Sequence, residues 1–228
     1  MPHLRAQTPV PLAGPLPVRL PVRLPGLLAG LLAGLLALTT ACEGEAPKPA
    51  PAPASSTPLG EVATDTVTVA RDDFCARVAP AAVEEALGAT PGDATAWANG
   101  ERAALTPDLT DVAHEYGCRW AADGTALRAW VFAPPVPAGQ AEDLRRAATR
   151  AEGCEPIADA PRFGSLGVAV RCAGGTGGSG VVTAFHGLFG DAWLSCSVET
   201  SGSVPVPPAE ALDRAGRWCA TVLQAAAA

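Results

Sequence analysis

The chain has 228 residues and a mass of 22.9 kDa, which fits one ordinary domain with additional segments. Apolar residues make up 48% of it and charged residues 17%, so the composition supports a packed core and excludes wholesale disorder. The 16 basic residues face 23 acidic ones, for a formal net charge of −7. Binding to a phosphate backbone needs clustered Lys and Arg, so we expect no nucleic-acid partner.

The N-terminus has the order of an export signal. Residues 1–23 contain arginines and no acid, residues 26–38 are uncharged and apolar, and small residues lead to Cys42. The apolar run is shorter than the about 20 residues that a membrane-spanning helix needs. The segment resembles a bacterial lipobox, which implies that residues 1–41 are removed and that Cys42 is acylated, although Thr39 replaces the usual aliphatic residue. An ordinary cleaved signal and an uncleaved anchor are the alternatives.

Residues 43–60 contain five prolines and no aromatic residue. Such a stretch buries too little apolar surface to fold, so we expect residues 42–60 to be a lipidated cysteine followed by a disordered linker. The remaining residues, 61–228, are predicted to form a single extracytoplasmic domain. Its expected location is the outer face of the cytoplasmic membrane, in contact with the membrane through the lipid.

Six cysteines remain after Cys42, and an even count in an exported chain indicates three disulfides. No CxxC pair is present, which argues against a zinc ribbon and against a thioredoxin-type redox pair. Six cysteines allow fifteen pairings, and one pair left free and buried is a further alternative. We expect pairs of sequence neighbours, namely Cys75–Cys118, Cys154–Cys172 and Cys196–Cys219.

The predicted elements begin with two short helices over residues 72–88, with Asp72 or Asp73 as the cap and Pro80 in a first turn. Residues 89–111 are expected to be irregular. A strand then starts at residue 117, turns at Asp123-Gly124 and returns over residues 125–133.

The second half of the domain alternates between the two element types. A helix is predicted over residues 138–152, ended by Gly153. Strands follow at residues 166–172, 181–189 and 191–199, the first two joined by a glycine-rich turn, and a helix begins at Pro208. Hairpin-connected strands flanked by helices predict an α+β fold with an antiparallel sheet of about five strands.

Three short motifs carry a resemblance to a known family. A cysteine precedes a short helix that ends in Ala86-Leu87-Gly88, residues 117–120 read GCRW, and residues 163–170 read FGSLGVAV. Over residues 72–225 the chain resembles a family of actinobacterial cell-envelope lipoproteins whose domain is catalogued without a function. The second and third cysteine pairs go beyond the core pattern of that family. The resemblance implies a lipid-anchored, extracytoplasmic, non-enzymatic protein and transfers no site.

Catalytic motifs are missing from the sequence. His114 starts a zincin-like HE pair without the second histidine, and His186 stands alone in a strand. No GxSxG occurs, and the glycine-rich stretch GGTGGSG lacks the Lys-Ser/Thr of a phosphate loop. We therefore expect no enzyme, no cofactor and no metal site.

One face of the sheet is a candidate binding surface. Alternation along the strands places Arg128, Trp130, Arg171 and Trp193 together on the side away from the core. Trp and Arg are favoured anchors at interfaces, so these four could form a flat binding surface. The alternative is that a helix covers this face and simply buries the tryptophans.

The expected function is a non-catalytic binding or sensing domain for an envelope component or a partner protein. One alternative is a secreted envelope-modifying hydrolase that uses His114 or His186. The other is a purely structural accessory lipoprotein.

Overall fold

The structure is a computed structural model of the chain, and it describes residues 56–106, 109–174, 180–201 and 206–228. The predicted signal peptide, Cys42 and residues 43–55 of the predicted linker lie outside the described residues, as do residues 175–179 of the glycine-rich turn. Within the described part, no helix is both long enough and apolar enough to cross a membrane.

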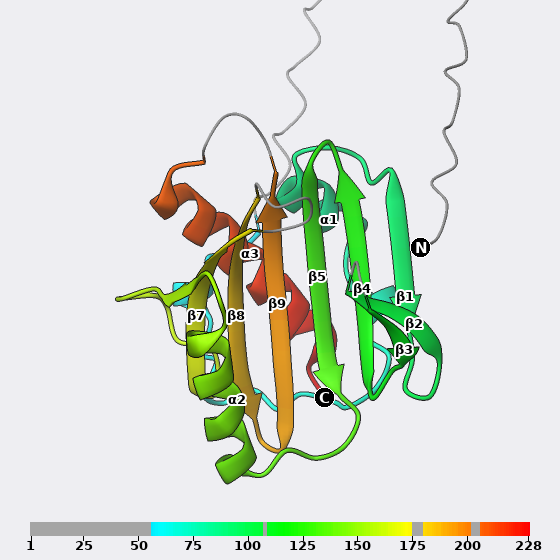
Figure 1. Ribbon diagram of the computed structural model, residues 1–228, viewed down its shortest axis with the longest axis vertical. Helices are drawn as coiled ribbons and strands as arrows, with labels where there is room; N and C mark the ends of the chain where they lie inside the picture. Colours follow the sequence, from blue (N-terminus) through cyan, green and yellow to red (C-terminus); the bar gives the residue numbers. More distant parts are fainter. Residues whose placement is uncertain (1–55, 107–108, 175–179, 202–205) are drawn as a thin grey trace, which may run out of the picture. The chain divides into compact units, whose positions relative to one another are not determined.

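Seven strands form one antiparallel sheet in the order β1-β4-β5-β9-β8-β7-β6 (Figure 1). Asp123 and Gly124 both have a positive φ, as the tight turn between β4 and β5 requires. The strands are β1 (Asp93–Trp97), β4 (Glu115–Ala122), β5 (Thr125–Phe132), β6 (Cys154–Pro156), β7 (Ser165–Ala173), β8 (Val181–Phe189) and β9 (Ala192–Thr200). The predicted α+β class is confirmed.

The sheet is larger than the five strands that the sequence predicted, because β1 and β6 were missed. Four of the five residues of β1 are exposed, so this edge strand has no apolar alternation to reveal it. Strand β6 has only three residues and includes Pro156. The segment predicted to be irregular also forms a separate hairpin of β2 (Arg102–Thr106) and β3 (Leu109–Val112).

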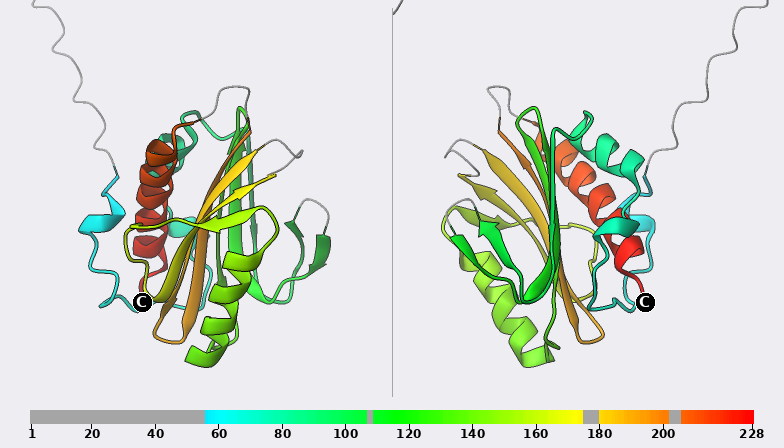
Figure 2. Two further views of the ribbon diagram at one scale, coloured as in Figure 1. Left: turned by 60° about the vertical axis from the view of Figure 1, so that its left-hand side comes forward. Right: turned by 90° about the vertical axis from the view of Figure 1, so that its right-hand side faces the viewer.

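Helices lie on both faces of the sheet (Figure 2). Helix α1 (Pro80–Leu87) and helix α3 (Pro208–Ala226) cover one face, called here the α3 face. Helix α2 (Ala138–Arg150) and the β2–β3 hairpin lie on the opposite side, called here the α2 face. The first predicted helix is a single 3-10 turn, Cys75–Arg77, and Asp73 Oδ1 accepts a hydrogen bond from the Cys75 N–H.

The main core lies between the sheet and α3. Leu127, Phe185 and Leu194 point toward the helix from the three central strands and are fully buried. Helix α3 buries Trp218 and Leu223 against them. Each such side chain contributes about 1.5–3 kcal/mol on burial, so this layer supplies much of the folding free energy.

Three disulfides join the expected neighbours in sequence: Cys75–Cys118, Cys154–Cys172 and Cys196–Cys219. The first ties the 3-10 turn to β4, and the third ties α3 to β9. The second joins the directly paired residues of β6 and β7. In the chain-entropy model each loop of this length contributes about 3 to 4 kcal/mol.

The packed domain begins before residue 61, where the sequence analysis placed its start. Leu59 is buried in the main core, and the Ser56 hydroxyl donates to Glu85 Oε2 on α1 at 2.7 Å. The last residues of the predicted linker are therefore part of the fold.

Candidate functional site

Three of the four predicted surface residues share one face of the sheet. Arg128, Trp130 and Trp193 all lie on the α2 face, as expected from the alternation along β5 and β9. Arg171 does not join them. It pairs with Thr183, and through β9 with Val198, both of which point to the α3 face. The sequence prediction for Arg171 is therefore wrong.

The reason is that β7 carries apolar side chains on both faces. By the same alternation, an outward Arg171 implied that Ala169 also points outward and that Val168 and Val170 face the core. In the structure the two valines lie on the α2 face, beneath α2, and Ala169 joins the α3 core. Both faces of this strand are covered, so its alternation did not say which side holds the main core.

Helix α2 closes one half of the α2 face. Trp193 is 2% exposed and packs with Ala141 of α2, with Leu188 and with Val136 in a second core cluster. Trp130 is half-buried beside it and meets Phe132 edge to face, with ring centroids 4.8 Å apart. The alternative that a helix buries the tryptophans therefore holds for Trp193, which is unavailable as a surface anchor.

The other half of the α2 face contains a cavity of about 430 Å³, called here the arginine groove. Strand β2 borders it through Ala104 and Leu105, and the sheet forms its floor. The floor residues are Asp93, Thr95, Trp97, Arg119, Ala126, Leu127, Arg128, Val182, Ser197 and Glu199. A neighbouring hollow of about 290 Å³ shares Asp93, Arg119, Ala126 and Glu199 with it. Volumes of this size are typical of small-ligand sites.

Two arginines lie side by side on the floor of the groove. Arg119 and Arg128 are directly opposite one another on β4 and β5. Like charges in this position repel, and each arginine has its own carboxylate partner. Arg119 Nη1 lies 3.2 Å from Asp93 Oδ2, and Arg128 Nη2 lies 3.1 Å from Glu115 Oε1. The pair thus depends on two flanking acids.

A glycine makes this arrangement fit. The Trp97 indole lies flat against Gly117, where a Cβ atom would be 2.4 Å from the indole Cζ2. Trp97 Nε1 donates to Glu115 Oε1 at 3.1 Å, the oxygen that also accepts from Arg128. The Arg128 guanidinium carbon is 5.3 Å from the centre of the Trp97 ring, within the range of a cation–π contact. Gly117, Trp97 and Glu115 together therefore fix the position of Arg128.

Burial acts on the charges of this cluster. It raises the pKa of Glu115, while the nearby Arg128 charge and the hydrogen bonds from Trp97 and Arg128 oppose that effect. Arg128 Nε is buried, and no described residue accepts a hydrogen bond from it. An unmade bond of this kind costs about 1–3 kcal/mol. Among the described residues, Arg128 thus has one buried donor without a partner.

His186 and Ser195 form a close polar pair under α2. His186 Nδ1 lies 2.8 Å from Ser195 Oγ, and the imidazole stacks on Trp193 with ring centroids 6.4 Å apart. Burial lowers the pKa of His186 to about 4, so the imidazole is neutral at neutral pH. Ser195 is only 2% exposed. The distance between the two side chains is that of a general base and its nucleophile, but the Ser195 hydroxyl is inaccessible to a substrate.

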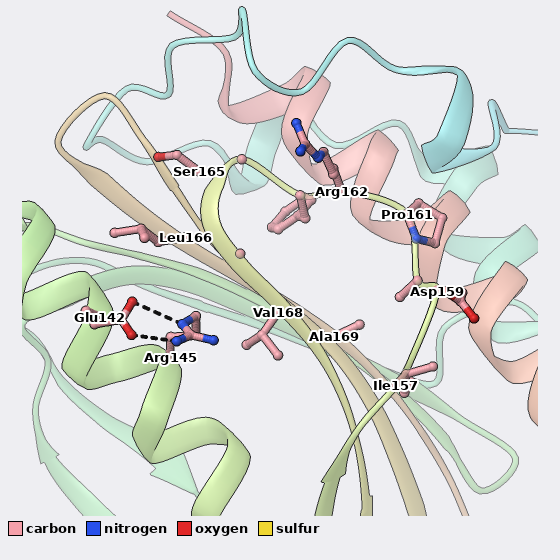
Figure 3. A pocket seen from close by; sticks show the side chains of 14 residues that line it. Glu142, Arg145, Ile157, Asp159, Pro161, Arg162, Ser165, Leu166, Val168 and Ala169 are labelled. Carbon is pink, nitrogen blue, oxygen red and sulfur yellow. Dashed lines mark hydrogen bonds and ion pairs between the residues drawn. The ribbon is translucent and has the colours of Figure 1, made fainter.

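A further hollow, of about 600 Å³, lies at the open edge of β7 (Figure 3). Strand β6 ends at Pro156, and the loop that follows wraps around the first half of β7. Glu142 and Arg145 of α2 form its other wall and bond to each other through two hydrogen bonds. Leu166 has φ +50° at a bulge in β7, a device that protects sheet edges from further strand pairing. We therefore interpret the bulge as a feature that protects this sheet edge from pairing with further strands.

Sequence reasoning missed most residues of the arginine groove. Asp93, Thr95 and Trp97 belong to the edge strand that was predicted to be irregular, and Glu115 was considered only as part of an HE motif. One signal was available, since Trp97 is the one aromatic residue of residues 89–111 and lies close to Asn99-Gly100, a strong turn dipeptide. An aromatic next to a turn signal would have supported a strand.

No cluster of three or more metal-ligating side chains occurs among the residues that the structure describes. The predicted lipidation site, Cys42, is outside them. No protein-family model matches the chain, and a search of curated proteins finds no match to it. The resemblance to an actinobacterial lipoprotein family stays a prediction.

Proposed function

We propose that this chain is a non-catalytic binding domain, held by a lipid on Cys42 at the outer face of the cytoplasmic membrane, and that its ligand occupies the arginine groove. One observation carries the proposal. Arg119 and Arg128 lie side by side in a cavity of about 430 Å³. Gly117, Trp97 and Glu115 together fix the position of Arg128. A cluster that holds a charged side chain against the repulsion of its neighbour is typical of a binding site.

The compartment is supported by the disulfides. Three such bonds in one domain are stable in oxidising surroundings and rare in the cytosol. The export signal and the cysteine at its end supply the rest of the argument for a lipid anchor.

Binding is favoured over the hydrolase alternative by the positions of the two histidines. His186 has a serine beside it, but that hydroxyl is buried beneath α2. His114 is exposed and follows β3, and no described residue forms a hydrogen bond with its side chain. A purely structural accessory would need no groove with a charged floor, and the experiment below separates the two.

The test measures the melting temperature of the full-length protein with fractions of the envelope extract of its own host. A ligand at 100 times its dissociation constant stabilises the folded state by about 2.7 kcal/mol, which is readily measured. Ala126 lies on the floor of both hollows, so Ala126→Trp fills the groove and leaves its charges in place. Ala94 is the matched control, since it is exposed on the same sheet and lies outside the groove.

We expect at least one fraction to stabilise the wild type and Ala94→Trp, and to leave Ala126→Trp unchanged. An equal shift in all three proteins would place the ligand elsewhere. A wild type that no fraction stabilises would favour the structural accessory and contradict the proposal.

A further inference from the structure

The charges that line the arginine groove balance. Its lining contains two arginines, Arg119 and Arg128, and two acids, Asp93 and Glu199. Glu115, the ion-pair partner of Arg128, is not part of the lining. An anionic ligand would meet the carboxylates of Asp93 and Glu199. A cationic ligand would meet both guanidinium groups. Neither sign of charge is favoured by the residues that line the cavity.

Donors and acceptors are instead arranged in two adjacent rows. Thr95, Arg119, Arg128 and Ser197 occupy neighbouring positions across β1, β4, β5 and β9. The next row across the same strands is Asp93, Ala121, Ala126 and Glu199. Guanidinium groups only donate, carboxylates only accept, and a hydroxyl group does both. A ligand with several hydroxyl groups can therefore bond to both rows at once.

The remaining lining suits the carbon skeleton of such a ligand. Ala126 and Val182 leave apolar surface on the floor, and Ala104 and Leu105 provide it on the side of β2. Small-molecule sites are mostly apolar with a few placed polar groups.

We infer that the ligand of the arginine groove is a neutral, hydroxyl-rich saccharide, an inference that rests on the proposed function and adds the ligand class to it. The volume of about 430 Å³ holds one or two sugar rings. The hydroxyls of these rings accept from Arg119 and Arg128 and donate to Asp93 and Glu199.

Isothermal titration calorimetry tests the ligand class. The full-length protein, in a detergent without a sugar headgroup, is titrated with neutral oligosaccharides released from the envelope of its host. Inorganic phosphate serves as the anionic probe, and spermidine serves as the cationic probe. Arg128→Gln removes the donor fork, and Arg171→Gln is the matched control, an arginine of the same sheet on the opposite face.

We expect saccharide binding that changes little with salt, because a neutral ligand is not screened. Arg128→Gln should weaken it about 10- to 100-fold, as for the loss of a hydrogen bond from a charged group, and Arg171→Gln should not. Salt-sensitive binding of phosphate or spermidine that depends on Arg128 would overturn the inference.

The outcomes also separate the inference from the proposed function. If an envelope fraction stabilises the wild type but not Ala126→Trp while no saccharide binds, the groove is a binding site and the saccharide assignment is wrong. If neither the fractions nor the saccharides act on the wild type, both are wrong.

Discussion

Gly117→Ala tests the cluster that fixes Arg128. The added Cβ would lie 2.4 Å from Cζ2, 2.6 Å from Cε2 and 2.9 Å from Nε1 of the Trp97 indole. Contacts this short force the ring to move. The displacement breaks the bond from Trp97 Nε1 to Glu115 and separates the ring from Arg128.

The magnitude follows from these contacts. Overpacking costs about 1–3 kcal/mol, and loss of a hydrogen bond to a charged group costs about 1.5–3 kcal/mol. Replacing a strand glycine by alanine returns up to about 1 kcal/mol of backbone entropy. We expect Gly117→Ala to lower the free energy of unfolding by about 2–4 kcal/mol.

A second background isolates the cause. Trp97→Leu removes the ring atoms that occupy the space above Gly117, so in this background Gly117→Ala should be neutral or slightly stabilising. Equilibrium unfolding in guanidinium chloride, with the disulfides intact, measures all four proteins of the cycle. An equal cost in both backgrounds, or a cost below about 0.5 kcal/mol in the wild type, would refute the close approach of ring and glycine.

The remaining predictions concern buried groups. Because burial holds the pKa of His186 near 4, below 6.5 in the unfolded chain, stability falls by up to about 3 kcal/mol as the pH drops from 6.5 to 4. In His186→Gln the free energy of unfolding should change less with pH over this window, and in the exposed His114→Gln it should change as in the wild type. An equal pH dependence in both variants would contradict the prediction. Burial raises the pKa of Glu115 above 4.5, so its contribution to stability falls as the pH rises through the pKa of the folded state. Glu115→Gln should therefore gain stability relative to the wild type between acid and neutral pH. A stability difference between the two proteins that does not change with pH would refute this. Trp193→Ala should cost about 3–5 kcal/mol in urea unfolding, since it empties the cluster under α2, and a cost below about 1 kcal/mol would exclude that packing.

The central strands could be predicted because apolar side chains recur at every second position on the side of the main core. Leu127 and Leu194 mark β5 and β9 in this way, and Asp123-Gly124 marks the turn between β4 and β5. The disulfide pairing followed the nearest neighbours in sequence, which here are also neighbours in space. Local pattern and fold agree in this part of the chain.

The edges and the groove could not be predicted, for a different reason. Strand β1 is held by pairing to β4 and by the ion pair of Asp93 with Arg119, and Trp97 is its one buried residue, so its own residues carry no strand pattern. Arg171 was assigned to the wrong face because β7 is covered on both sides. Arg119 and Arg128 are cross-strand neighbours only because of the register between β4 and β5. The two arginines in the sequence do not by themselves reveal that register.

The indole N–H signals of the five tryptophans give the most direct test of the groove as the binding site. The tryptophans are at positions 97, 120, 130, 193 and 218, and all lie within the described residues. Nitrogen–proton spectra of the labelled protein are recorded with and without the active envelope fraction, with signals assigned by Trp→Phe variants. We predict that the Trp97 signal moves most, and that Trp120 and Trp218, which pack edge to face on the α3 face, stay in place. Movement of the Trp120 and Trp218 signals with Trp97 unchanged would contradict the assignment.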